Sequence, residues 1–294
     1  MRIMIKFLLI LIFSLVCSSS YSQSKHALLI GISDYGNANL GWSNIHGAND
    51  VNLLNTTLKN NSFNVIKVCN KAATAKRIRK EFNKLISKCK SGDYVYVHFS
   101  GHGQPFEDMD GDEDDGWDES IIPYDAQMKY VRGRYEGGNH ITDDELNKYI
   151  KKLQRIVGVN GLVFVVIDAC HAGGSSRGED EDEEEAQYCR GTKTAFTPSG
   201  KEFRPRINTK SNFKISTDND ESHIIILEAC RSYQSNYEIK ENGHYYGPLS
   251  YNLNKVLTSS NFTMDINLIF KVKQFMDQDR RLVRQNMVYE SSIQ

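Results

Sequence analysis

Two short segments of this chain carry residue types that together can perform acyl transfer. Ser100–Gly103 has the sequence Ser-Gly-His-Gly, and Asp168–Gly174 has the sequence Asp-Ala-Cys-His-Ala-Gly-Gly. The first segment places His102 between two glycines, and the second contains Cys170. A cysteine sulfur can attack a carbonyl carbon, while an imidazole can take the thiol proton and later protonate a leaving amine. This pair is the minimal apparatus for a reaction that passes through an acyl-enzyme.

Each segment follows an apolar run that is long enough to form a buried strand. The runs are Tyr94–Phe99 (YVYVHF) and Leu162–Ile167 (LVFVVI). In an open parallel sheet, the loops that leave the carboxyl ends of the strands line the ligand crevice. If both runs lie in one such sheet, we expect Cys170 and His102 to meet at the same edge although they are far apart along the chain.

Both residues have an alternative interpretation. Cys170 could be an inert buried cysteine, because an isolated cysteine commonly behaves as a small apolar side chain. His102 could be a structural histidine or a zinc ligand, but zinc needs further cysteine or histidine ligands at a matching spacing, and only His171 is nearby in the sequence. The glycines beside His102 favour a catalytic loop, since they let the backbone turn tightly and approach a substrate.

The overall charge excludes some classes of partner. The 294 residues carry a formal net charge of −1, which gives no general attraction to nucleic acid or to an acidic membrane. The charge is nevertheless uneven, with acidic runs at Glu107–Glu119 and Glu179–Glu185 and a basic stretch at Arg190–Lys214. The length suffices for one large domain or two small ones.

The first 22 residues predict a secretory signal peptide. Arg2 and Lys6 flank the start of an apolar stretch, Phe7–Val16, and small and polar residues lead to a cleavage point after Ser22. About ten apolar residues are too few to span a bilayer. We therefore expect a secreted or periplasmic protein whose mature chain has no membrane span. Lipid attachment at Cys17 is the alternative, although the residues before it fit a lipobox poorly.

The rest of the chain alternates predicted strands and helices. The predicted strands are His26–Ile32, Phe63–Val68, the two runs above and a strand that contains Ile224–Leu227. The predicted helices are Ala48–Lys59, a helix capped by Thr74, a helix from the capping box Thr142–Glu145 to about Ile156, Gly247–Leu257 and Asp265–Gln278. Strands separated by helices of this length imply an α/β fold, with a mostly parallel sheet of about six strands between helices on both faces.

One stretch interrupts this alternation. Ser175–Glu221 has little apolar periodicity, and consists of an acidic run followed by scattered Arg, Lys, Pro and Ser. Such a long segment is typically functional or flexible. We expect one domain over residues 23–294, with a flexible charged surface insertion at about 175–221.

Taken together and in order, these motifs resemble the metacaspases, within the wider caspase-like cysteine peptidases. The matching segments are HALLIGISDY (26–35), GANDVNLL (47–54), FSGHG (99–103), DGDEDDGWDESIIPYDA (110–126), ITDDEL (141–146) and VVIDACHAGG (165–174). The later ILEACRSYQSNYE and GPLSYNL look like the family's smaller C-terminal subunit region. The animal-caspase signature around the cysteine is absent, and Asp168-Ala169-Cys170 stands in its place.

The resemblance implies a caspase-like three-layer sandwich and a cysteine endopeptidase. Cys170 would be the nucleophile and His102 its partner, while the backbone N–H groups of Gly103 and Cys170 would hold the oxyanion. No organic cofactor is implied. The partners would be peptide or protein substrates rather than nucleic acid.

Two aspartates match the acidic specificity-pocket positions of metacaspases. Asp50 and Asp168 would pair with a cationic side chain, so the resemblance implies cleavage after Arg or Lys. The alternative for Asp50 is a helix-cap role near Ala48. The alternative for Asp168 is a carboxylate that bonds to local backbone at the end of a strand.

The acidic loop suggests calcium, which prefers hard oxygen ligands. Counting from Asp110, an EF-hand is excluded, because Asp115 rather than glycine stands sixth and Ile121 rather than Glu stands twelfth. The resemblance to metacaspases points to other positions, and three of the family's calcium aspartates match Asp118, Asp143 and Asp144 of this sequence.

The fourth calcium position falls on Arg177, which cannot bind a cation. Glu179 or Asp180 could serve instead. The alternative needs no metal, because Asp143 and Asp144 lie in the first turn of a predicted helix, where carboxylates favour the helix dipole.

The insertion suggests regulation by self-cleavage. An Arg/Lys-specific enzyme could cut itself between Ser175 and Lys214 and so be made as a zymogen; the candidate sites are Arg190, Lys193, Lys201, Arg204, Arg206 and Lys210, all expected to be exposed. Two other function classes stay open. One is a catalytically silent caspase-like binding or scaffold module, and the other is a thiol-dependent transpeptidase.

Overall fold

The structure is a computed structural model that describes residues 23–36, 38–171, 188–192, 194–205, 218–259 and 262–293. The predicted signal peptide and a large part of the predicted insertion, including Arg177, Glu179 and Asp180, lie outside the described residues. Within these ranges, no helix is long and apolar enough to cross a membrane.

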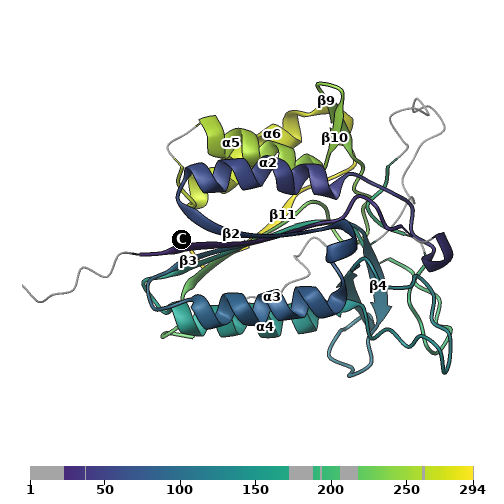
Figure 1. The fold of residues 1–294 in the computed structure, drawn as a ribbon. Helices are drawn as coiled ribbons and strands as arrows, with labels where there is room; N and C mark the ends of the chain where they lie inside the picture. Colours follow the sequence, from purple (N-terminus) through teal and green to yellow (C-terminus); the bar gives the residue numbers. More distant parts are fainter. Residues whose placement is uncertain are drawn as a thin grey trace, which may run out of the picture.

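A six-stranded sheet forms the centre of the molecule (Figure 1). Its strand order is β11-β8-β7-β3-β1-β2. Every neighbouring pair is parallel except β11 with β8. The strands are β1 (Lys25–Gly31), β2 (Phe63–Cys69), β3 (Tyr94–Ser100), β7 (Leu162–Asp168), β8 (His223–Glu228) and β11 (Val288–Ser291). The prediction of a mostly parallel sheet of about six strands is confirmed.

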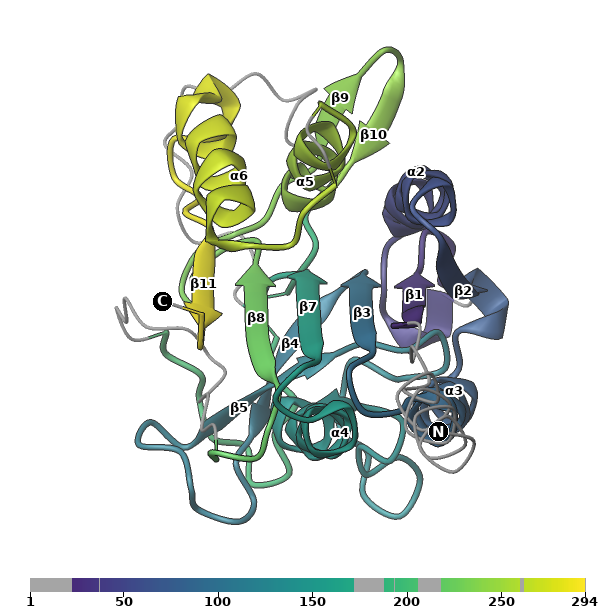
Figure 2. The same cartoon turned by 90° about the vertical axis from the view of Figure 1, so that its left-hand side faces the viewer.

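Helices cover both faces of this sheet. Figure 2 shows α2, α5 and α6 on one face and α3 and α4 on the other. Their bounds are α2 (Gly47–Asn60), α3 (Ala75–Lys88), α4 (Asp143–Val157), α5 (Pro248–Ser259) and α6 (Ile266–Gln278). The result is the predicted three-layer α/β sandwich.

The apolar runs form strands because both of their faces are buried. In β7, Val163 and Val165 pack into the core under α3 and α4, whereas Phe164 and Val166 pack into the core under α2, α5 and α6. All seven residues of this strand are buried. A strand that must be apolar on both faces appears in the sequence as a continuous run rather than as an alternation, as is typical of parallel sheets.

The helix starts follow their predicted caps only in part. The side chains of Thr74 and Thr142 each accept a hydrogen bond from the backbone N–H three residues later, as a capping residue should. Glu145, the other half of the predicted capping box, instead pairs with Arg79 of α3 at 2.7 Å. The ion pair joins α3 to α4 on the outside of the sheet.

Two smaller sheets were not predicted. One contains β4 (Gly103–Glu107), β5 (Trp117–Ile121) and β6 (Ile141–Thr142), and the other is a hairpin of β9 (Ile239–Glu241) and β10 (His244–Tyr246). Short 3-10 turns lie at Ala38–Leu40, Asn70–Ala72 and Arg280–Leu282. The β4–β5 hairpin begins directly after His102, so part of the acidic loop is anchored to the edge of the central sheet where β3 ends.

Candidate active site

The two chemical segments leave neighbouring strands at the same edge of the sheet. β3 and β7 lie side by side in Figure 2, and their register pairs Ser100 with Asp168. His102 and Cys170 each follow two residues after this pair. The parallel register therefore brings together two loops that are distant in the sequence.

His102 is held in a defined orientation by its surroundings. The ring lies between Tyr35 and Trp42, with centroid distances of 4.9 and 5.1 Å. Its Nε2 lies 2.9 Å from the carbonyl oxygen of Ser43, so the neutral ring donates its Nε2–H there and keeps a lone pair on Nδ1. This Nδ1 is buried and has no hydrogen-bond partner in the described part of the chain.

Burial shifts the pKa values of both His102 and Cys170 toward their uncharged forms. Burial lowers the pKa of His102 to about 4, although the bond to Ser43 opposes this. Burial also raises the pKa of the Cys170 thiol well above its usual value. Near neutral pH the two adjoining loops therefore hold a thiol and a neutral imidazole, and the lone pair on His102 Nδ1 is the basic group of the site.

The two N–H groups expected to hold an oxyanion converge on one oxygen atom. The backbone N–H groups of Gly103 and Cys170 both donate to the carbonyl oxygen of Arg190, at 3.0 and 3.1 Å. Two fixed donors aimed at one carbonyl oxygen have the arrangement of an oxyanion hole. A Cβ at Gly103 would lie 2.6 Å from the carbonyl oxygen of Cys170, so the approach of the two loops requires glycine there.

The Arg190 side chain fills a pocket of acidic groups. Its Nη1 lies 2.7 Å from Asp50 and 3.5 Å from Asp168, and its Nη2 lies 2.8 Å from Glu238. Its Nη1 also donates to Ser100 Oγ at 2.6 Å. The expectation that Arg190 is exposed is wrong: the residue is 0% exposed, because these carboxylates compensate the cost of burying the guanidinium.

Asp50 faces the pocket and does not cap its helix. The N-terminal cap position of α2 is His46, which makes no side-chain cap bond. The Asp50 carboxylate instead accepts hydrogen bonds from Ser100 Oγ and from the Gly247 backbone N–H. Burial raises the pKa of Asp50 to about 7 even though Arg190 lowers it. A carboxylate in such a pocket strongly favours a cationic partner.

Asp168 is fully buried in the pocket and is held by residues from other elements. Its carboxylate accepts bonds from the backbone N–H and Oγ of Ser250, at 2.8 and 2.6 Å, and from Asn236 Nδ2 at 2.7 Å. These partners come from α5 and from the segment after β8, not from local backbone. Asp168 thus connects the pocket to the C-terminal part of the fold and adds a second negative charge near Arg190.

Three contributors to the pocket were not identified from the sequence. Ser100 lies inside the quoted histidine motif, so its position at the end of β3 could have indicated it. Glu238 lies in the later segment that resembles the small-subunit region, and no spacing or periodicity distinguishes it from other surface acids. Arg190 was included in a set of exposed basic residues, and its pairing with the pocket exists only in the tertiary structure.

The three aspartates expected to bind calcium lie in a crowded acidic region. Asp118 groups with Asp108 and Asp112, and Asp144 groups with Asp110 and Asp112, each set having carboxylate oxygens within 4.8 Å of one another. Burial, reinforced by neighbouring aspartates, raises the pKa of Asp118 to about 7. So many carboxylates at close range repel one another unless protons or a cation compensate them.

Asp143 is not in either of these groups, but it has the most unusual environment. Its Oδ1 is buried and lacks a hydrogen-bond partner among the described residues. Burial, together with the charge of Asp118, raises the pKa of Asp143 well above its usual value. A buried oxygen without a donor, next to hard anionic oxygens, fits the ligands that a calcium ion prefers.

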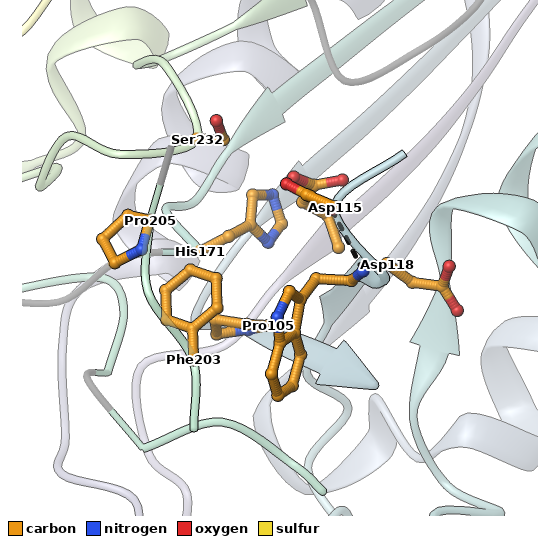
Figure 3. A pocket seen from close by; sticks show the side chains of 9 residues that line it. Pro105, Asp115, Asp118, His171, Phe203, Pro205 and Ser232 are labelled. Carbon is orange, nitrogen blue, oxygen red and sulfur yellow. Dashed lines mark hydrogen bonds between the residues drawn. The ribbon is translucent and has the colours of Figure 1, made fainter. Parts of the chain in front are cut away.

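A hollow lies on the other side of the cysteine loop. Figure 3 shows His171 at its wall, facing Pro105 and the aromatic ring of Phe203. Trp117 also lines the hollow. Asp118 also contributes to the wall, but its carboxylate points away from His171. His171 therefore points into this hollow beside the β4–β5 hairpin, although it directly follows Cys170.

The fold and the site together define a caspase-type architecture: a three-layer sandwich with a buried histidine and a buried cysteine in the loops that follow two adjacent parallel strands. The family model of the caspase domain matches residues 24–292, and the chain belongs to this family. The name of this family model refers to peptidases.

Metacaspases are among the relatives of this chain. The chain is 31% identical to metacaspase-1 of Coccidioides immitis over 53% of this chain and 32% of that protein. It is 26% identical to metacaspase-1 of Schizosaccharomyces pombe over 65% of this chain and 48% of that protein. The matches thus span about a third to a half of these relatives' lengths.

A solved structure has the same fold. Protein GSU0716 from Geobacter sulfurreducens matches with a TM-score of 0.61, over 92% of this chain and 94% of that chain. The sequence identity is 17%, so this likeness concerns the fold alone.

Proposed function

We propose that this protein is a cysteine endopeptidase that cleaves after arginine or lysine, and that the Arg190–Gly191 bond is its own first substrate. One observation carries the proposal. Arg190 lies in the site as the residue before a scissile bond would, with its carbonyl oxygen on the N–H groups of Gly103 and Cys170 and its guanidinium on Asp50. The proposal therefore assigns recognition of the side chain to Asp50 and polarisation of the carbonyl to the two N–H groups.

The nucleophile is next to this bond. A Cβ at Gly191 would lie 2.3 Å from Cys170 Sγ, so the sulfur packs directly against the residue after Arg190. Glycine at this position is what allows the peptide to lie so close to the thiol. The docked peptide also fills the site, which accounts for the burial of Cys170 and His102.

The reaction follows from these positions. His102 Nδ1 accepts the thiol proton as Cys170 Sγ bonds to the Arg190 carbonyl carbon, and the electron pair moves to an oxygen held by two N–H groups. The carbon–nitrogen bond then breaks, and His102 returns the proton to the Gly191 amine. Water activated by His102 hydrolyses the thioester, which frees the Arg190 carboxylate and regenerates the thiol.

The same contacts make the uncut chain a zymogen. An external substrate needs the pocket and the oxyanion donors that Arg190 occupies, so cleavage must precede turnover of other peptides. The pocket also excludes an acidic residue before the scissile bond, since Asp50, Asp168 and Glu238 would repel it. We therefore propose arginine or lysine specificity, unlike the aspartate specificity of animal caspases.

A panel of fluorogenic peptides tests the proposed function. We expect self-processed wild-type protein to hydrolyse peptides that end in Arg. Peptides that end in Asp should be hydrolysed no faster than in buffer without enzyme. Cys170→Ala should reduce turnover by at least about 10³-fold, because the nucleophile is lost. Product masses with an added amine separate hydrolysis from transpeptidation. Absence of turnover of every peptide would overturn the proposal and favour a binding module.

We further propose that the acidic cluster binds calcium, with Asp118, Asp143 and Asp144 as ligands. The support is the unpartnered buried Oδ1 of Asp143 and the raised pKa values of Asp118 and Asp143. Because Asp118 lies on β5, whose partner β4 begins at Gly103, a bound cation would stabilise the strand that carries an oxyanion donor.

Calcium binding should be measured directly. We expect calorimetric titration of Cys170→Ala protein, which stays uncut, to show binding and a rise of the melting temperature. Adding Asp143→Asn should weaken the affinity by at least about tenfold, since a charged ligand is lost. Asp277→Asn, at an exposed position of α6, is the matched control and should bind calcium normally. If Cys170→Ala protein with all its aspartates intact showed no heat of calcium binding and no change in melting temperature, this site would be excluded.

A further inference from the structure

The guanidinium of Arg190 is shared between two separate sets of acceptors. Nη1 contacts Asp50, Ser100 and the carbonyl oxygen of Asp168. Nε and Nη2 both donate to a single oxygen, Oε1 of Glu238, at 3.1 and 2.8 Å. Different residues therefore bind the two sides of the guanidinium: one side carries Nη1, and the other carries Nε and Nη2.

Glu238 is also held by a residue other than Arg190. Its side chain is 0% exposed. The backbone N–H of His46 donates to Oε1 at 2.7 Å, and His46 Nδ1 lies 2.6 Å from Oε2. The His46 ring in turn stacks on Tyr245 and meets the edge of Tyr188. Glu238 thus presents a carboxylate held by His46 to the side of the guanidinium that carries Nε.

Arginine and lysine differ at this side of the pocket. The single ammonium of a lysine can take the place of Nη1, where Asp50 and Ser100 accept its protons. It has no second nitrogen for Glu238, which would stay buried with a charge that only His46 offsets. A site built to hydrogen-bond a group strongly rejects an analogue that lacks it, because buried polar atoms are left unpaired.

We infer that Glu238, positioned by His46, is the residue that makes this site select arginine over lysine, whereas Asp50 supplies attraction common to both cations. The inference rests on the proposed function, since it concerns the specificity of the same site. Discrimination between arginine and lysine is thus assigned to Glu238 in the C-terminal part of the chain. Attraction of either cation is assigned to Asp50 in α2.

The test is the ratio of kcat/KM for two peptides that differ only in Arg or Lys before the scissile bond. A ratio measured in one preparation does not depend on how much of that preparation is folded. We expect self-processed wild type to prefer Arg by at least about 100-fold. Glu238→Gln should reduce this ratio at least about tenfold, through loss of Arg turnover while Lys turnover is retained. Asp50→Asn should reduce both turnovers and leave the ratio within about threefold.

Self-cleavage provides a second measurement that needs no external substrate. In an otherwise wild-type chain, Arg190→Lys should slow cutting after residue 190 by at least about tenfold. In a chain that already carries Glu238→Gln, adding Arg190→Lys should change the cutting rate little. The outcomes separate the two proposals. Wild type that cuts neither peptide overturns the proposed function. Wild type that cuts Arg and Lys peptides equally, or a Glu238→Gln variant that loses both equally, leaves the function standing and overturns the role of Glu238.

Discussion

Purified wild-type protein is expected to be cut between Arg190 and Gly191, whereas Cys170→Ala remains one chain. The scissile carbonyl already lies on two N–H donors and the sulfur already packs on Gly191, so the reaction needs little further reorganisation. Loss of the nucleophile should slow the cut at least about 10³-fold. Intact mass spectrometry of the two fragments identifies the bond, and a rate that is independent of protein concentration shows that the cut is intramolecular.

Two further variants sharpen this result. Cys69→Ala alters a half-buried thiol at the end of β2 and should be cut at the wild-type rate. Gly191→Ala keeps the whole dyad but introduces a Cβ 2.3 Å from Cys170 Sγ, so we expect its cut to slow by about 10²-fold. Cutting after Arg190 in Cys170→Ala, or wild-type cutting only at another bond, would contradict self-cleavage at this site.

Asp50→Asn is expected to reduce kcat/KM for Arg-ended peptides by about 10²–10³-fold. Asp50 is fully buried, contacts the guanidinium at 2.7 Å and is itself held by Ser100 and Gly247. Removing one partner of a buried, hydrogen-bonded charge pair typically costs about 2–5 kcal/mol. Steady-state kinetics on the self-processed enzyme measure this loss, and self-cleavage of the same variant should be slowed as well.

The matched control is again Asp277→Asn, which removes a carboxylate of the same type from the exposed face of α6 and should retain full activity. Thermal unfolding distinguishes loss of function from loss of folding. A folded Asp50→Asn enzyme with wild-type kcat/KM would show that Asp50 does not recognise the substrate cation, and the pocket would then have to depend on Asp168 and Glu238.

Much of the scaffold follows from local sequence. The continuous apolar runs of β3 and β7 predict strands buried on both faces, and the helices between them require parallel connections. Thr74 and Thr142 mark two helix starts correctly. Because side chains after neighbouring parallel strands must leave at the same edge, the convergence of the loops that carry His102 and Cys170 could be expected before any coordinates were known.

Local sequence was a poor guide where a residue's environment comes from distant segments. Glu145 has the spacing of a capping-box residue, but Arg79 from another helix competes successfully for its carboxylate. The β4–β5 hairpin was missed because its strands are short and the acidic residues between them are typical of a loop. Such choices depend on partners that become available only after the layers have packed.

The types and order of its residues alone determined that this chain forms a parallel α/β sandwich with a cysteine and a histidine at one edge. Only the tertiary structure decided which side chains form the acidic pocket at that edge and that Arg190 fills it. A buried arginine costs several kcal/mol unless carboxylates surround it, and those of Asp50, Asp168 and Glu238 come from three separate parts of the chain. No local pattern records such a meeting, so only the folded chain shows Arg190 seated where a substrate would bind.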